Sequence, residues 1–392
     1  MRILVIHCAY QLKSGEDIVV QEEMKLLKSY DNNVELLTFS NEGSVLLKLL
    51  QLPFNLSSYA KTIRTIREFQ PDVVHIHNLH FAGSASVLYA VKRCNVPMVM
   101  TLHNYRLLCP AAILFVDGKL FLDSINQSFP YNAVKKKAFR NSYVLTAWMA
   151  LSMKLHNMLG TYHLPDKLIF LTEYAKDVFR QSHLQLHEDS VVVKPNFIYG
   201  FPVASLKRGD HFFYVGRLSE DKGTMLLLET FAESDLTIQI AGDGPMKDLV
   251  QSYSAKHPNI QYLGTVSNQQ VHIAMQKASA LLFPSIWYEG MPLTIIEAFA
   301  CYLPVIASNL GAMRSMINDG YNGLHFEPGN KTALTKALYN WHSLTGTAKE
   351  VYRNNARTTY ERLYSPENNV AQLTSIYRSV TGNKQVPSLS VI

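Results

Sequence analysis

The sequence predicts an α/β protein made of two Rossmann-like, doubly wound domains that face each other across a cleft. Its length of 392 residues suits two domains of ordinary size. Short continuous apolar runs alternate with amphipathic helical patterns, which is typical of buried parallel strands connected by helices. The alternation stops once near the middle of the chain and then restarts, which indicates a second domain.

The first half contains continuous apolar runs that we interpret as buried strands. These runs occupy residues 2–7, 34–39, 72–78, 97–103, 167–172 and 190–197. Helical patterns fill most of the intervals, including residues 17–30 and 81–94. The first domain is therefore expected to span residues 1–197.

Residues 198–210 contain glycine, proline and polar residues without a clear period, and we interpret them as a linker. Strand patterns then follow at residues 212–217, 236–242, 260–264, 279–285, 304–308 and 323–328. The second domain is expected at residues 211–365. Residues 366–392 are expected to form a C-terminal helix that packs back toward the first domain, followed by a frayed tail.

The composition favours a globular protein of a reducing compartment. The chain is 47% hydrophobic and carries a net charge of +6. The four cysteines are dispersed, which argues against a disulfide framework and a zinc site. The first apolar run is too short for a signal peptide, and no run reaches the ~20 residues of a membrane span. We therefore expect a cytoplasmic location, with peripheral attachment to the inner face of the cell membrane as a further hypothesis.

That hypothesis rests on residues 124–165, which contain no acidic residue. Lysine, arginine and aromatic residues are interleaved there, including Lys135, Lys136, Lys137 and Arg140. Such a segment can bind an anionic lipid surface. The alternative is a solvated basic helix that covers part of the core.

Three glycine-containing turns follow strands of the second domain and lead into helices. They are GRLSEDKG (216–223), AGDGP (241–245) and SIWYEGMP (285–292). Ligands bind beyond the carboxyl ends of such strands, and helix N-termini favour phosphate. Because Arg217 and Lys222 add two positive charges, the turns predict a diphosphate site. A Walker loop is excluded by the order Lys222-Gly223-Thr224, and no dinucleotide fingerprint follows the first strand.

Two glutamates lie close to the third turn. Leu293, Ile296 and Ala300 are expected to form a buried stripe on the helix, with Glu297 beside it and Glu289 in the preceding loop. A buried carboxylate needs partners. Ribose hydroxyls would serve Glu297 and sugar hydroxyls Glu289, whereas an internal ion pair or a backbone N–H is the structural alternative for Glu297.

The segment EGMPLTIIE, from Glu289 to Glu297, resembles the E-x7-E motif of the retaining glycosyltransferases of family 4. The first two turns resemble the other C-terminal motifs of that family, and VKPNF (193–197) resembles its interdomain boundary. SGEDIVVQEE (14–23) and TLHNYRLLCP (101–110) resemble its first loop and a strand end of its N-terminal domain. The resemblance covers nearly the whole chain and is weakest at residues 124–165.

This resemblance implies the GT-B fold and a reaction that moves a sugar from a nucleotide diphosphate-sugar to an acceptor hydroxyl with retention of configuration. The donor would be a UDP- or GDP-sugar, with no cofactor, no metal and no nucleic acid partner. The relatives that it most resembles build bacterial cell-surface polysaccharide or lipopolysaccharide. A lipid-linked or growing glycan would therefore be the acceptor, and residues 1–197 would form the acceptor-side domain.

The resemblance also assigns roles to residues. Arg217 and Lys222 would hold the diphosphate and stabilise the leaving group, Glu297 would bind ribose, and Glu289 the donor sugar. His103 would contact the sugar or the reacting centre. The remaining donor-binding positions would supply backbone N–H groups or permit close approach; they are Gly15, Gly216, Gly242, Gly244, Gly290, Met291, Pro292 and Leu293.

The sequence departs from the family pattern at Ser14, where many relatives have glycine, and at Asn104, where they have aspartate. Asn104 cannot act as a base, which keeps open the alternative of a non-catalytic sugar-nucleotide-binding protein. A glycoside hydrolase is disfavoured because Glu289 and Glu297 belong to one loop-helix unit and do not flank a substrate from two sides. A dehydrogenase is disfavoured by the missing fingerprint.

Overall fold

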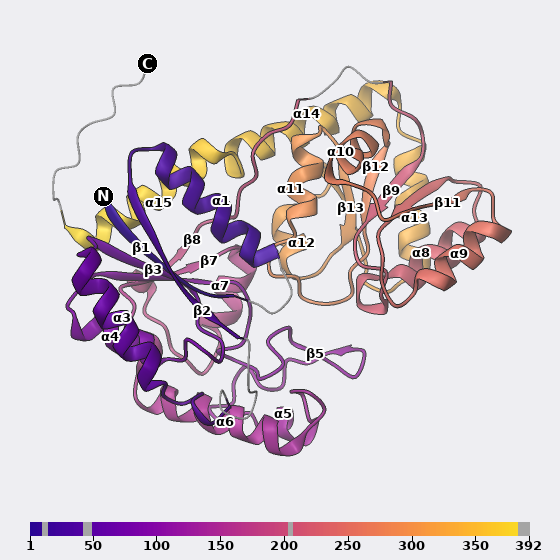
Figure 1. The fold of residues 1–392 in the computed structure, drawn as a ribbon. Coiled ribbons are helices and arrows are strands. Elements are labelled where there is room, and N and C mark those ends of the chain that lie inside the picture. Colours follow the sequence, from indigo (N-terminus) through magenta and orange to yellow (C-terminus); the bar gives the residue numbers. More distant parts are fainter. Residues whose placement is uncertain (10–14, 42–48, 203–206, 383–392) are drawn as a thin grey trace. The chain divides into compact units, whose positions relative to one another are not determined.

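The computed structural model describes residues 1–9, 15–41, 49–202 and 207–382. Ser14, part of the expected linker and the expected frayed tail from residue 383 lie outside these ranges. The described residues form two compact units, whose elements are drawn in Figure 1. The first unit comprises the described parts of 1–113, 121–196 and 369–382, and the second those of 114–120 and 197–368.

The first unit is organised around a sheet of six parallel strands in the order β2-β1-β3-β4-β7-β8. Its strands are β1 (Arg2–Ala9), β2 (Asn33–Ser40), β3 (Val73–Asn78), β4 (Met98–Leu102), β7 (Lys167–Phe170) and β8 (Val191–Val193). Its helices are α1 (Gly15–Ser29), α3 (Leu56–Phe69), α4 (Ser86–Arg93), α5 (Tyr131–Lys135), α6 (Tyr143–Met158) and α7 (Glu173–Arg180). The direction of strand order reverses between β1 and β3.

The second unit contains another sheet of six parallel strands, in the order β11-β10-β9-β12-β13-β14. The strands are β9 (Phe212–Val215), β10 (Ile238–Ala241), β11 (Ile260–Gly264), β12 (Ala280–Phe283), β13 (Val305–Ser308) and β14 (Gly323–Phe326). This is the 3-2-1-4-5-6 order of dinucleotide-binding folds, and its direction reverses between β9 and β12.

Helices follow the strands of the second unit, as the amphipathic patterns predict. They are α8 (Thr224–Ala232), α9 (Lys247–Lys256), α10 (Asn268–Lys277), α11 (Leu293–Ala300), α12 (Gly311–Met316), α13 (Lys331–His342) and α14 (Gly346–Leu363). The last helix, α15 (Pro366–Thr381), runs from the second unit into the first. A short hairpin of β5 (Phe115–Val116) and β6 (Lys119–Leu120) completes the strands that are described.

The predicted α/β class with two Rossmann-like sheets is confirmed, and two boundaries differ from the expectation. The strand expected at 190–197 ends at Val193, because Pro195 has no N–H to continue the ladder. The helix expected at 81–94 begins at Ser86, because Phe81 and Ser84 have positive φ angles of 60° and 52°.

Candidate functional site

A cavity of about 150 Å³ lies at the point in the second unit where the strand order reverses. Its walls come from the ends of β9 and β12 and from the turns that follow them. Tyr214, Val215, Gly216, Arg217, Lys222, Phe283, Pro284, Ser285, Glu289, Pro292 and Thr294 line it. Two of the three turns singled out in the sequence, at 216–223 and 285–292, therefore meet at one cavity.

The buried carboxylate of Glu289 is the best-anchored group of this cavity. Its Oε1 accepts hydrogen bonds from Lys222 Nζ (2.6 Å), Ser285 Oγ (2.9 Å) and Trp287 Nε1 (2.8 Å). Lys222 Nζ also lies 4.8 Å from the centre of the Trp287 ring. The two residues that the resemblance assigns to sugar and to diphosphate are therefore bonded to each other in this structure.

Arg217 is the second cation of the cavity, and its side chain is exposed. In the described ranges, no hydrogen bond or ion pair involves its guanidinium group. Its backbone carbonyl accepts a hydrogen bond from the buried Tyr214 hydroxyl (2.9 Å), which fixes the turn after β9. The guanidinium is thus attached to a fixed backbone and remains available to a ligand.

Close backbone packing explains the glycines of these turns. A Cβ atom at Gly242 would lie 1.9 Å from the Gly216 carbonyl oxygen, and one at Gly244 would lie 2.4 Å from that of Leu218. Gly216 lines the cavity, whereas Gly242 and Gly244 hold the second turn against the first. Gly223, which the sequence analysis did not assign to the site, has φ +75° and leaves a Cβ only 2.2 Å from the Pro284 carbonyl oxygen.

Helix α11 places Glu297 in partly buried surroundings. The expected stripe is wrong at Leu293, which is half-buried, whereas Ile295, Ile296, Ala298, Phe299 and Ala300 are buried. Within the described ranges, the Glu297 carboxylate makes no hydrogen bond or ion pair, and burial raises the pKa of its carboxyl. Gly290 is also half-buried, Met291 is buried, and Pro292 lines the cavity and precedes the helix.

His103 follows β4 in the first unit and lies against a second histidine. His103 Nε2 and His77 Nδ1 are 3.0 Å apart, and the two rings stack. Burial, and next the neighbouring His77, hold the pKa of His103 well below its ordinary value. The imidazole is therefore neutral near pH 7 and can accept or donate a hydrogen bond.

Gly15 and Asn104 are two further residues of the first unit that the sequence singles out. Gly15 is the first residue of α1, with open space where a side chain would begin. Asn104 Oδ1 accepts a hydrogen bond from the Arg106 N–H (3.0 Å), so this amide stabilises the turn after β4.

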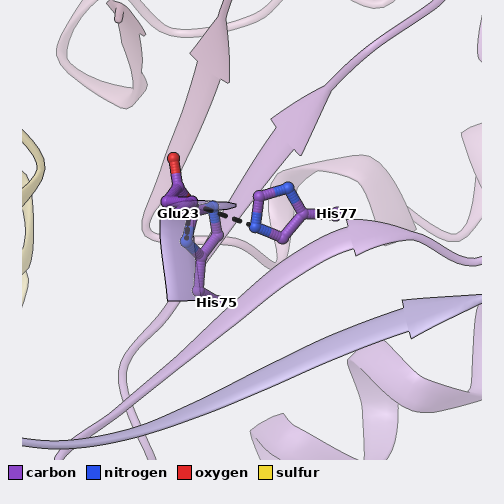
Figure 2. Close-up of side chains that lie close together, drawn as sticks. All are labelled: Glu23, His75 and His77. Atoms are coloured by element: carbon purple, nitrogen blue, oxygen red, sulfur yellow. Dashed lines mark ion pairs between the residues drawn. The ribbon is translucent and has the colours of Figure 1, made fainter. Parts of the chain in front are cut away.

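A buried ionic network lies next to His103 and was not predicted from the sequence; Figure 2 shows part of it. Glu23 Oε1 lies 3.4 Å from His75 Nδ1 and 3.2 Å from His77 Nε2. Glu23 Oε2 accepts a hydrogen bond from the buried Lys194 ammonium (2.5 Å). Desolvation raises the pKa of Glu23, but Lys194 and the histidines outweigh it and hold that pKa well below its ordinary value.

Glu23, His75 and His77 come close enough to be considered as metal ligands. Their hydrogen bonds do not fit that use. His75 Nδ1 is 2.7 Å from the Tyr377 hydroxyl and its Nε2 is 2.8 Å from Thr101 Oγ1, while Lys194 occupies Glu23. The network is a structural one, and two histidines in the buried run DVVHIHN were the sequence signal for it.

None of the helices in the described ranges combines the length and the apolar character that a transmembrane span requires.

Two family models match the chain. Residues 38–199 match Glycosyltransferase Family 4, and residues 202–359 match Glycosyl transferases group 1. An uncharacterised glycosyltransferase of Methanocaldococcus jannaschii is 24% identical over 86% of this chain and 87% of its own length. The alpha-monoglucosyldiacylglycerol synthase of Acholeplasma laidlawii is 26% identical, over 78% of this chain and 79% of its own length.

Solved structures agree with the sequence matches. A glycosyltransferase from Rickettsia africae superposes with a TM-score of 0.71 at 20% identity, over 98% of this chain and 99% of that one. The Anabaena protein HepE in complex with UDP-glucose gives a TM-score of 0.64 at 15% identity, over 97% of this chain and 100% of that one. With two Rossmann-like units and both family models matched, this chain belongs to the family 4 type of glycosyltransferases and has the GT-B fold.

Proposed function

We propose that the protein transfers a sugar from a UDP- or GDP-sugar to a hydroxyl of a lipid-linked or growing surface glycan, with retention of configuration. The observation that carries this proposal is the cavity of the second unit, which joins Arg217, Lys222 and Glu289. HepE, a protein of the same fold, is solved with UDP-glucose. That complex supports a nucleotide-sugar donor here.

The cavity's charges suit the departure of a nucleoside diphosphate. Negative charge grows on the leaving phosphate as the glycosidic bond breaks, and cations placed in advance stabilise that state. Arg217 and Lys222 would supply this stabilisation without a metal ion. When Lys222 turns to the diphosphate, Ser285 and Trp287 still hold Glu289 Oε1, so the carboxylate keeps its place for a sugar hydroxyl.

Glu297 would bind the ribose. A carboxylate that is partly desolvated gains from hydroxyl donors, and ribose hydroxyls supply two of them. His103 would face the transferred sugar or the reacting centre, as a neutral imidazole that His77 orients.

A thermal-shift panel with UDP, GDP, ADP and CMP and their common sugar conjugates tests the donor site. At 100 times its dissociation constant, a ligand stabilises the folded protein by about 2.7 kcal/mol. One diphosphate should shift the wild type, and Glu297→Ala should lose most of that shift. The matched control is Glu68→Ala, which removes an exposed carboxylate from α3. If no nucleotide shifts the wild type, the donor proposal fails.

We also propose that residues 124–165 dock on an anionic membrane. Along α6, Val144, Leu151, Leu155 and Met158 are all exposed, and their spacing of seven, four and three residues places them on one face. Lys135, Lys136 and Arg140 are exposed just before this helix. An apolar stripe with neighbouring cations suits the interface of a lipid bilayer.

Co-sedimentation with vesicles that contain anionic lipid tests the docking. Replacement of Lys135, Lys136, Lys137 and Arg140 by Gln should reduce binding and weaken its salt dependence. Leu151→Ser with Leu155→Ser should reduce binding at every salt concentration. Binding that neither set changes would contradict the proposal.

A further inference from the structure

The two ring nitrogens of His103 lie in different surroundings. Its Nε2 is 3.0 Å from His77 Nδ1, so one of these two atoms donates a hydrogen bond to the other. In the part of the chain that the structure describes, His103 Nδ1 makes no hydrogen bond, and the atom is not fully enclosed by protein. The residue lines a cavity of about 100 Å³ in the first unit. Nδ1 is therefore the ring nitrogen that a ligand can contact.

The other nitrogen of His77 lies beside a carboxylate. Glu23 Oε1 is 3.2 Å from His77 Nε2, as Figure 2 shows, and both residues are buried, at 3% exposure each. The contact is ionic, since His77 Nε2 makes no hydrogen bond within the described ranges. A bare Nε2 would leave its lone pair beside the negative charge of Glu23, and the weak screening of the interior makes that repulsion strong. The proton of a neutral His77 therefore lies on Nε2.

Lys194 keeps Glu23 charged and balances its charge. The Lys194 ammonium donates to Glu23 Oε2 (2.5 Å) and to Asn369 Oδ1 (3.3 Å). Desolvation raises the pKa of Glu23, but Lys194 and the histidines outweigh it and hold that pKa well below its ordinary value. One buried positive charge thus offsets one buried negative charge. A charged imidazole beside this pair would add a buried charge without a counterion, which is costly.

The proton on His77 Nε2 determines the tautomer of His103. With its proton on Nε2, His77 has a bare Nδ1, which can only accept a hydrogen bond. His103 Nε2 then donates across the 3.0 Å contact, so the His103 proton lies on Nε2 and its Nδ1 is bare. Glu23 therefore acts on His103 through His77.

We infer that Glu23 and His77 are positioning residues that fix His103 in the tautomer whose Nδ1 accepts a hydrogen bond. The inference rests on the proposed function, because it specifies how His103 would meet the sugar. Nδ1 would accept from a sugar hydroxyl and could not donate to a phosphate or carboxylate oxygen. The tautomer is also a property of the protein without a ligand, so it can be measured separately.

Long-range proton–nitrogen correlation spectra of the full chain, with isotope-labelled histidine, report which ring nitrogen carries a proton. At about pH 8, above the ordinary histidine pKa of about 6.5, His103 should show a protonated Nε2 and a bare Nδ1. His103→Asn identifies its signals. His183 is the internal reference for the opposite tautomer, because its Nδ1 lies 2.8 Å from the Ile125 carbonyl oxygen, which can only accept.

Two variants test whether Glu23 and His77 set this tautomer. Glu23→Gln with Lys194→Met removes both buried charges, and an amide can present either its oxygen or its N–H to His77. His77→Phe keeps an aromatic ring but removes the acceptor of His103 Nε2. Each variant should lower the ratio of the two His103 tautomers by about tenfold or more.

Glu22→Gln with Lys25→Met is the matched control. It makes the same two substitutions in a surface ion pair (2.7 Å) that both residues contribute from α1, the helix of Glu23. The ratio of the His103 tautomers should stay unchanged in this control. The His183 signals should keep their pattern in every variant, which shows that each variant remains folded.

Binding measurements test the contact between Nδ1 and the sugar. The two test variants should weaken binding of the nucleotide-sugar about 2- to 12-fold, the range that one hydrogen bond supplies. Binding of the nucleoside diphosphate alone should not change, because the second unit would hold it. Equal losses for both ligands would contradict the contact.

A wild-type His103 with its proton on Nδ1 or on both nitrogens, or a tautomer ratio that survives both variants, overturns the inference. Failure of the proposed function gives a different result. In that case no nucleotide-sugar binds or is transferred, while the His103 tautomer and its loss in the two variants persist.

Discussion

Gly223 shows, at the scale of one residue, that the cavity of the second unit depends on two backbone segments packing closely against each other. Its φ of +75° disfavours any side chain, and a Cβ would meet the Pro284 carbonyl oxygen at 2.2 Å. Gly223→Ala should cost about 1–2 kcal/mol for the left-handed backbone and a further ~1–3 kcal/mol for the clash. Gly320→Ala is the matched control, because Gly320 has φ +78° and open space around it. Urea unfolding should rank Gly223→Ala as the less stable variant, and equal losses would contradict the role of the clash.

Glu297 is expected to lower the stability of the free protein at neutral pH. Burial raises the pKa of its carboxyl above the unfolded value. At pH values between the unfolded and the folded pKa, the folded state therefore binds more protons than the unfolded state. The contribution of the Glu297 carboxyl to stability is therefore fully present below its ordinary pKa. This contribution is lost as the pH rises through the raised pKa of the folded state. Glu297→Gln should be more stable than wild type at pH 7, with a difference that shrinks toward pH 4, as measured by urea unfolding without nucleotide. A constant difference across pH would rule out this explanation.

Residue identity predicted part of the cavity of the second unit. Arg217, Lys222, Glu289 and Pro292 were singled out from the sequence and line one cavity. The sequence could not show that Lys222 bonds Glu289, because 67 residues separate them and only the packed turns bring them together. Ser285 and Trp287 were part of a quoted motif, but their donation to Glu289 depends on loop geometry that no period encodes.

At the scale of elements, the Glu23–Lys194 ion pair connects α1 to the residue that follows β8. Both side chains are buried, at 3% and 1% exposure. Lys194→Met leaves a buried carboxylate without its cation and should cost about 3–5 kcal/mol. The double variant Glu23→Leu with Lys194→Met removes both charges and should recover a large part of that loss. Urea unfolding of Glu23→Leu, Lys194→Met and the double variant measures the coupling between the two side chains. If the loss of the double variant equals the sum of the two single losses, the two charges do not stabilise each other.

The strands were predictable because a buried parallel strand is a continuous apolar run, and every expected strand has a counterpart in the two sheets. The first and last residues of strands and helices were less predictable where the conformation of a single residue determines them. Pro195 ends one strand early, and the positive φ angles of Phe81 and Ser84 delay α4. The apolar face of α6 could not be separated from a core face by spacing alone, because burial depends on what packs there.

For the whole molecule, the buried histidines make the first unit the more acid-sensitive of the two. Burial, and next His77, hold the pKa values of His75 and His103 well below the ordinary value of about 6.5. The unfolded chain therefore binds more protons as pH falls below about 6.5, and stability decreases. Glu23 acts in the same direction at lower pH, because its pKa is lowered in the folded state. Hydrogen exchange at pH 7.5 and 5.5, corrected for intrinsic rates, should show faster opening of β3 at the lower pH. The same change in β10 would argue against a local origin.

Tyr377 on α15 is buried at 1% exposure, and its hydroxyl lies 2.7 Å from His75 Nδ1 in the middle of the first sheet. All six strands of that sheet are complete at Val193, yet residues 369–382 belong to the same unit, and Leu373 and Tyr377 are buried there. A ribosome delivers the chain from the N-terminus, so most of the second unit emerges before the last helix of the first. The N-terminal sheet therefore remains partly uncovered until translation has nearly ended. The second unit is synthesised later but can complete its fold first.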